Sequence, residues 1–291
     1  MSTNRYFSFS RLGLVMKREL MENWKTNLYR LLGPYAGFLM VILFSYMVEC
    51  DYNSFSTIML SAFTLVLVFG GAFNASYIME SMNTQQKRIS YLMLPATSLE
   101  KFLARAIYVT LGFFLMMVIA LLLAEATRFM LLPLFNLSDD FHQSIIPFIW
   151  EKLTTVELMK FTGPGAEESY RLAYFREAIS LLVIFWAHSF FILGGCYWQK
   201  HPFWKTLGSL ILVNHLIVLL IIILVQSLGD INWMIDEEWI EQMEIRFSWI
   251  TVEGICSFFI VLFASLLALN WWLSYRCFTR SQVIKPKFRL L

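Results

Sequence analysis

The residues of this sequence that come closest to a pattern for acid–base or metal chemistry begin at Glu167 and Glu168. His188 follows, and Asn214 and His215 stand together further along. Carboxylates and histidines at helical spacing are what a metalloprotease uses to hold a metal ion and to activate water. These residues make an intramembrane metalloenzyme one hypothesis for the chain.

The spacing of these residues fits that hypothesis poorly. The segment Glu167-Glu168-Ser169-Tyr170-Arg171 is similar to the Glu-Glu-x-x-x-Arg motif of a family of membrane proteases, but its arginine comes one residue early. The sequence holds no His-Glu-x-x-His, no Gly-x-Ser-x-Gly and no Gly-x-x-x-x-Gly-Lys-Ser/Thr, the loop that cradles nucleotide phosphates. Its four cysteines are scattered without a Cys-x-x-Cys pair, so they predict neither a zinc site nor a disulfide framework. We therefore do not expect an enzyme, a metal or a cofactor in this chain.

Polar side chains inside long apolar stretches are the next candidates, because each is costly in a membrane. Four stand out: Asn74, His188, Asn214 and His215. Two roles are open to them, a hydrogen bond between helices or a place along a transport path. For His188, Asn214 and His215 we favour the hydrogen bond.

Three other features of these stretches have simpler interpretations. Glu253 and Asn270 lie towards opposite ends of the last stretch, where a polar side chain can reach the membrane surface. Gly70-Gly71 is expected to allow close helix packing rather than to open a hinge.

Six long apolar stretches contain or flank these residues. The sequence is 58% hydrophobic and 15% charged, against roughly 45–50% and about 25% in soluble domains. Each stretch is close to the ~20 residues that a helix needs to cross the hydrocarbon of a bilayer. They cover residues 31–48, 55–80, 103–126, 174–196, 206–228 and 249–273. The sequence thus predicts an all-α, polytopic membrane protein with six transmembrane helices over residues 31–273.

The basic residues predict the orientation. If all six stretches cross, most of the 23 Lys and Arg residues fall on one side. They occupy the segment 1–30, the loops after the second and fourth stretches, and the tail 274–291. Loops rich in Lys and Arg stay in the cytoplasm, so both termini are predicted to be cytoplasmic. The longest connection on the other side is then the loop 128–173, whose apolar part around 145–159 is expected to form one or two helices on the outer leaflet or the bundle, before a turn at 161–165.

Residues 9 to 30 are predicted to form an amphipathic helix on the membrane surface. Apolar residues recur every four positions and basic residues recur every seven on the opposing face. The apolar set is Leu12, Met16, Leu20, Trp24 and Leu28, and the basic set is Arg11, Arg18 and Lys25. The alternative is a basic topology signal that happens to be helical.

The loop between the second and third stretches is the most specific local pattern. Pro95 disfavours helix at Leu94, and Thr97 with Glu100 forms a capping box where a new helix starts. We therefore expect a short helix around 88–93, a break, and then the third membrane helix. Such an element suits contact with a soluble partner, although it could also be a well-capped turn.

In these features the chain resembles the permease subunits of type-2 ABC exporters. The resemblance rests on a basic amphipathic helix before six spans and on the loop pattern Arg-x-x-Tyr-Leu-x-Leu-Pro-x-x-x-x-Glu-Lys-Phe after the second. Its sequence-specific part is confined to residues 11–30 and 85–108. The resemblance implies that the loop 85–102 is a coupling helix docked on a separate ATPase. The residues it places at or beside that contact are Arg88, Tyr91, Leu92, Leu94, Pro95, Glu100 and Lys101.

The resemblance also implies the partners and the location of the chain. ATP would be bound by the separate ATPase, and a second permease subunit, identical or homologous, would complete the path. The location would be the lipid bilayer of a bacterial inner (plasma) membrane, and nucleic acid is not expected as a partner. The chain differs from the family in one respect. The family usually has its long outside connection before the last span, whereas the long connection of this chain is 128–173. No substrate is therefore assigned, and a non-transporting membrane scaffold stays the alternative.

Overall fold

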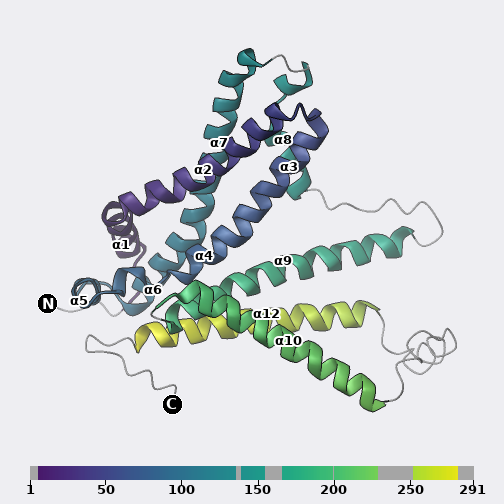
Figure 1. The fold of residues 1–291 in the computed structure, drawn as a ribbon. Coiled ribbons are helices and arrows are strands. Elements are labelled where there is room, and N and C mark those ends of the chain that lie inside the picture. The colour runs from purple at the N-terminus through teal and green to yellow at the C-terminus, as the bar shows by residue number, and fades with distance from the viewer. Residues whose placement is uncertain (1–5, 136–138, 155–165, 199, 229–251, 281–291) are drawn as a thin grey trace.

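The structure is a computed structural model that describes residues 6–135, 139–154, 166–198, 200–228 and 252–280. Within these ranges the chain forms helices and no strands (Figure 1). Six helices or helix series are long and apolar enough to cross a membrane. They are Trp24–Met47, Tyr52–Met82, Ser98–Leu134, Ala178–Tyr197, Pro202–Leu220 and Cys256–Thr279. The prediction of an all-α protein with six membrane-crossing helices is confirmed.

Two of the spans are interrupted by short π-helices. The second span is α3 (Tyr52–Leu65), η1 (Val66–Gly70) and α4 (Gly71–Ser76). The third span is α6 (Ser98–Ile107), η3 (Tyr108–Gly112) and α7 (Phe113–Leu131). The other spans are continuous helices: α2 (Trp24–Met47), α9 (Ala166–Tyr197), α10 (Pro202–Leu228) and α12 (Val252–Thr279).

The amino-terminal helix is shorter than its sequence pattern predicts. Helix α1 covers Phe9–Glu22, and α2 begins at Trp24, so the single helix expected over 9–30 is wrong. Asn23 separates the two helices, because its backbone leaves the helical region while its side-chain amide donates to the Glu19 backbone oxygen at 3.0 Å. Asparagine bonds its neighbouring backbone readily, and this competes with helix propagation.

Helix α1 also divides its apolar residues between two environments. Leu12 and Val15 are buried against Ala104 of α6, while Met21 at the end of α1 and Trp24 at the start of α2 are exposed. One part of the helix therefore packs on the protein, and the other part faces the surroundings at the end of the bundle.

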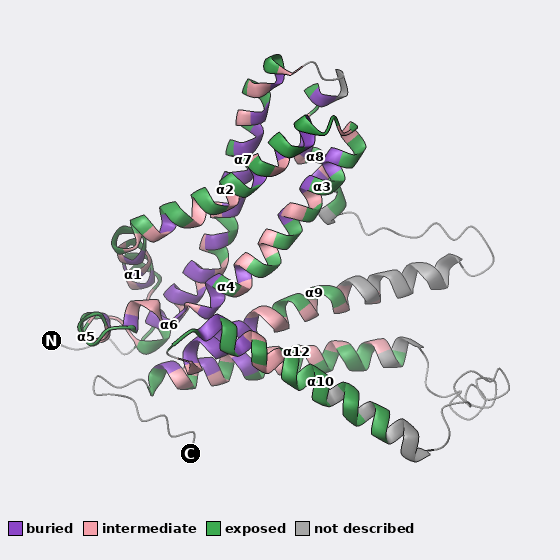
Figure 2. Cartoon of the chain, in the orientation of Figure 1, coloured by how far each residue is buried: buried purple, intermediate pink, exposed green. Residues whose placement is uncertain are grey.

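The helices form two groups that meet near the end of the molecule that carries α1. In Figure 1, α2, α3, α7 and α8 (Ile145–Thr154) run together, and α9, α10 and α12 run together. Helix α4 links the groups because it packs against α9 and α10. Figure 2 shows buried residues concentrated at this junction, whereas α10 is mostly exposed along its described length.

A buried ion pair fixes the far end of the first group. Arg128 binds Glu125 one turn away, with 2.8 Å between its Nε and the Glu125 Oε2, and its guanidinium also donates to the backbone oxygens of Phe141 and Gln143, both at 2.7 Å. The Ile145 amide donates to Glu125 Oε1 at 2.9 Å, so this carboxylate caps the start of α8. The helix predicted in the loop 128–173 is confirmed as α8, and its buried side chains join the core of the α2–α3–α7 group. The predicted turn at 161–165 lies outside the described residues.

Gly195 brings α9 against the backbone of α4. A Cβ added at Gly195 would lie 2.3 Å from the Ser76 backbone oxygen, whereas one added at Gly208 of α10 would meet nothing within 4 Å. We predict that Gly195→Ala destabilises the protein by about 1–3 kcal/mol, because backbone atoms must move apart. Gly208→Ala should be neutral or slightly stabilising, since alanine is the better helix former.

Thermal unfolding of both variants in the same detergent, followed by tryptophan fluorescence, measures this difference. Equal melting temperatures for Gly195→Ala and Gly208→Ala would show that the contact between α9 and α4 is not tight.

Candidate partner-binding site

The segment between the second and third spans folds as a short helix, a break and a new helix start. Helix α5 covers Gln85–Leu92, and the Thr84 side chain caps its beginning. Helix α6 begins at Ser98 with a complete capping box, in which the Thr97 amide donates to Glu100 Oε2 at 2.7 Å and the Glu100 amide donates to Thr97 Oγ1 at 3.2 Å. The arrangement expected from Pro95, Thr97 and Glu100 is confirmed, although α5 begins three residues before the predicted position 88.

Glu100 ties this segment to the amino-terminal helix. Its carboxylate is fully buried and accepts the Ser8 amide at 2.7 Å and Arg11 Nη2 at 2.9 Å, in addition to the capping bond from Thr97. Glu100 therefore uses its acceptors inside the chain and presents no free carboxylate to a partner.

Tyr91 and Lys101 join the two helices of the segment to each other. The Tyr91 hydroxyl donates to the Lys101 backbone oxygen at 2.9 Å, and Lys101 Nζ donates to the Leu92 backbone oxygen at 2.7 Å. Both side chains are buried, and burial raises the pKa of Tyr91, so its hydroxyl keeps its proton and stays a donor. These two bonds close the break between α5 and α6 into a compact unit.

Arg88 connects the same unit to the end of the second span. Its Nε and Nη2 donate to the Met82 backbone oxygen at 3.2 and 3.1 Å. The Met82 carbonyl stands where the span ends, so the guanidinium satisfies a backbone group that the helix leaves open.

The outer surface of the segment is apolar at three positions, which we call the tip: Ile89, Met93 and Pro95. Met93 is the most open of them, with 79% of its surface exposed. Leu92 and Leu94 are half-buried and pack on the cluster around Phe102. Ile89 and Met93 are not among the residues predicted at the partner contact. Their spacing of four residues puts them on one helix face, opposite the buried Tyr91.

A second buried ion pair lies beneath the segment. Arg105 Nη1 is 2.7 Å from Glu19 Oε2, and both side chains are almost completely buried. Arg105 also donates through Nε to the Ile78 backbone oxygen at 2.8 Å and through Nη2 to that of Tyr77 at 3.0 Å. The pair thus joins α1, the end of the second span and the start of the third. No local sequence pattern marks Arg105 for this contact, because its partner Glu19 is 86 residues away.

Each π-helix takes part in a close contact between the second and third spans. Asn74 is buried in α4, and its side-chain amide donates to the Val109 backbone oxygen inside η3. A Cβ added at Gly70, the last residue of η1, would lie 2.6 Å from the Phe113 ring, which confirms the close packing predicted for Gly70-Gly71 at its first residue. Asn74 therefore makes the kind of bond between helices that polar groups in spans supply.

The other polar candidates do not gather into one site. His188 is half-buried in α9, and its Nε2 is enclosed without a hydrogen-bond partner among the described residues. Asn214 and His215 are exposed on α10, and His215 Nδ1 bonds the Ile211 backbone oxygen of its own helix at 2.8 Å. Within the described residues, His215 bonds the backbone of its own helix, and the bond between helices that we favoured for it stays a prediction.

Asn270 differs from its sequence interpretation in the opposite direction. It is buried in α12 and donates to Ser189 Oγ of α9 at 3.0 Å. Instead of reaching the membrane surface, it joins two helices that pack closely along their length.

The metal-ligating side chains of the described residues do not form a metal site. Within the described ranges, no group of three or more His, Cys, Asp or Glu residues could hold a metal ion. The side chains of Glu167 and Glu168 lie outside the described part of the chain.

No protein-family model matches this chain, and no curated protein or solved structure matches it significantly.

We predict that Glu100→Gln loosens the amino-terminal helix. The carboxylate has two acceptor oxygens, whereas the amide has one oxygen and one NH2 donor. Either Ser8 or Thr97 therefore loses its acceptor, and Arg11 loses its charged partner in both cases. Hydrogen exchange of residues 9–22 should speed up roughly tenfold, which corresponds to about 1.4 kcal/mol.

Glu22→Gln is the matched control, because Glu22 makes only an exposed pair with Arg18 within the same helix. If exchange in residues 9–22 rises equally in both variants, Glu100 is not what holds α1 in place.

Proposed function

We propose that this chain is the membrane-spanning permease subunit of an ATP-driven exporter, and that a separate ATPase binds the tip formed by Ile89, Met93 and Pro95. The observation that carries the proposal is an exposed apolar tip held by internal hydrogen bonds, which we call the frame. The frame consists of the bonds of Arg88, Tyr91, Glu100 and Lys101. A surface of this kind suits a partner because apolar residues supply contact area and a fixed backbone lowers the ordering cost of binding.

The frame offers a path by which force on the tip reaches the membrane. Arg88 joins α5 to the end of the second span, and Tyr91 with Lys101 joins it to the start of the third. Glu100 carries the connection to α1. A push on the tip by closing ATPases would therefore move both spans and α1 as one unit.

The π-helices η1 and η3 give the moving unit a place to bend. Turns of this kind are common where helices kink and where proteins carry out their function. Because η1 and η3 interrupt the two spans attached to the tip, the cytoplasmic ends of those spans can tilt relative to their outer halves.

A second permease subunit is supported by the exposed face of α10. Asn214 and His215 lie there among exposed leucine, isoleucine and valine side chains. Polar groups on a lipid-facing surface are disfavoured, so we propose that this face meets an identical or homologous subunit, or the path between them.

The remaining parts of the proposal follow from the same role. Both termini and the tip would lie in the cytoplasm of a bacterium, where the partner ATPase binds ATP. The competing role, a membrane scaffold that transports nothing, keeps the same fold but has no need of an ATPase.

Partner capture tests the assignment of the tip. We predict that Ile89→Asp and Met93→Asp each lower the amount of a Walker-type ATPase that co-purifies with the tagged chain by about tenfold or more, because a buried carboxylate would be left without a partner at the contact. Lys205→Glu, an exposed change in the first turn of α10, is the control and should leave the ATPase bound.

Leu94→Asp and Glu100→Arg should also release the ATPase while leaving membrane insertion intact, although through damage to the frame rather than to the tip. Mass spectrometry of complexes purified in mild detergent provides the measurement. Undiminished ATPase recovery in both tip variants would contradict the docking site, and the repeated absence of any ATPase with the intact chain would favour the scaffold.

A further inference from the structure

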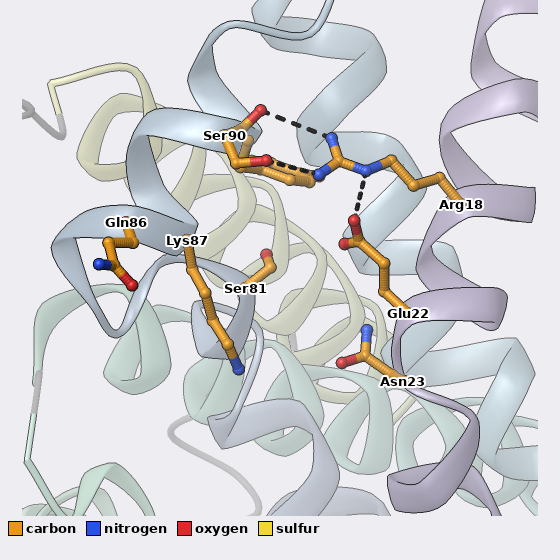
Figure 3. A pocket seen from close by; sticks show the side chains of 8 residues that line it. Arg18, Glu22, Asn23, Ser81, Gln86, Lys87 and Ser90 are labelled. Atoms are coloured by element: carbon orange, nitrogen blue, oxygen red, sulfur yellow. Dashed lines mark hydrogen bonds and ion pairs between the residues drawn. The ribbon is translucent and has the colours of Figure 1, made fainter.

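A pocket of about 410 Å³ opens between α1 and α5, behind the tip. Figure 3 shows its two walls, with Arg18, Glu22 and Asn23 on one side and Lys87 and Gln86 on the other. Ser81, Ser90 and Tyr91 complete the lining.

The pocket carries an excess of positive charge. Arg18 is paired with Glu22, with 2.7 Å between Nε and Oε1, and it donates to Ser90 Oγ at 2.8 Å. Lys87 makes no ion pair with any described residue, and in Figure 3 its side chain runs through the open space past Ser81. Two cations against one carboxylate leave one uncompensated positive charge facing the pocket.

Ser81 adds a hydroxyl donor, which reaches a ligand in the pocket once its side chain rotates. Ser81 Oγ is shielded from solvent and has no hydrogen-bond partner among the described residues. A buried hydroxyl without a partner is unfavourable, and a bound acceptor would satisfy it. An ammonium, a guanidinium edge and a hydroxyl around one space are the donors that a phosphate ester group uses.

The surroundings of the pocket are those of a membrane surface. It lies where the first three spans end, and the neighbouring Met21 and Trp24 expose 66% and 59% of their surface. Tryptophan and lysine at the end of a span are typical of the headgroup layer. Apolar side chains next to a cationic pocket can accommodate the acyl chains of a lipid whose headgroup enters the pocket.

We propose that this pocket binds a phosphate ester, and that its source is the headgroup of a phospholipid in the leaflet on the amino-terminal side. Lys87, Arg18 and Ser81 hold the phosphate oxygens. Glu22 stands across the pocket, where it suits the ammonium of an ethanolamine headgroup. The proposal needs only the membrane location of the chain and holds whether or not the chain exports anything.

Native mass spectrometry of the full-length chain in detergent tests the site, with added phosphatidylethanolamine, phosphatidylglycerol, diacylglycerol or inorganic phosphate. We expect saturable binding of the two phospholipids and none of diacylglycerol, which lacks the phosphate. Lys87→Gln should weaken phospholipid binding by about tenfold, since one charge-assisted contact is lost. Ser81→Ala should weaken it by a smaller factor.

Lys17→Gln is the matched control, because Lys17 is an exposed lysine of α1 that does not line the pocket. Inorganic phosphate that binds with the same dependence on Lys87 and displaces the lipid would keep the phosphate site but assign it to a soluble phosphate ester. Equal lipid binding by Lys87→Gln and Lys17→Gln, or binding of diacylglycerol as strong as that of the phospholipids, would overturn the proposal.

Discussion

The buried pair of Glu19 and Arg105 is the interaction on which the architecture at the α1 end of the bundle depends. Taking two charges out of water is expensive, and a single contact of 2.7 Å does not by itself offset that cost. The additional bonds offset part of that cost: Arg105 donates to two backbone oxygens at the end of the second span, and Glu19 Oε2 accepts the side-chain amide of Asn23 at 3.0 Å. Glu19 Oε1 is buried without a hydrogen-bond partner among the described residues. The charges can stay buried only while α1, the second span and the third span keep these positions, so the pair fixes all three.

The region around Arg105 and the region of the π-helical turns differ in how many polar contacts hold them. Around Arg105 the polar groups are held by several bonds at once, and Glu100 repeats the same design between α1 and α6. Further into the membrane, the second and third spans change to π-helical turns, and the main polar contact between them is the one from Asn74. In the proposed mechanism, the two spans tilt relative to each other at these turns, where fewer polar contacts hold them, while the part around Arg105 moves as a unit.

The division between what the sequence predicted and what it missed follows the range of the interactions. The break and restart between α5 and α6 depended on Pro95, Thr97 and Glu100, which act within a few residues, so their pattern was sufficient. The partners of Glu100 and Arg105 lie 92 and 86 residues away in α1 and before it, and no local pattern specifies them. The burial of Glu100 and Lys101 could not be predicted from the sequence for the same reason. Glu100 and Lys101 belong to a loop motif that resembles a contact surface, yet both are buried. Glu100 bonds Arg11 of α1, and Lys101 bonds the Leu92 backbone oxygen of α5.

The same reasoning applies to polar residues within the spans. Asn270 and His215 are both polar residues inside apolar stretches, so hydropathy does not distinguish them. Their roles depend on which neighbour each one faces. Asn270 lies on the side of α12 that packs against α9 and finds Ser189, whereas His215 lies on the open side of α10 and bonds its own helix. The direction of a side chain around a helix can be predicted from sequence only when a strong apolar face marks the buried side. Spans that are apolar all round carry no such mark.

The position of the phosphate pocket connects the membrane to the tip. One wall is α1, and the other is α5, whose outer face carries Ile89 and continues to Met93. Arg18 already bridges the two walls through Ser90, so a phosphate held between Arg18 and Lys87 adds a second bridge across the same gap. A ligand that binds one spacing of two elements better than another shifts the population towards that spacing. Headgroup binding would therefore stabilise the position of α5 relative to α1, and with it the orientation in which the tip is presented to a partner.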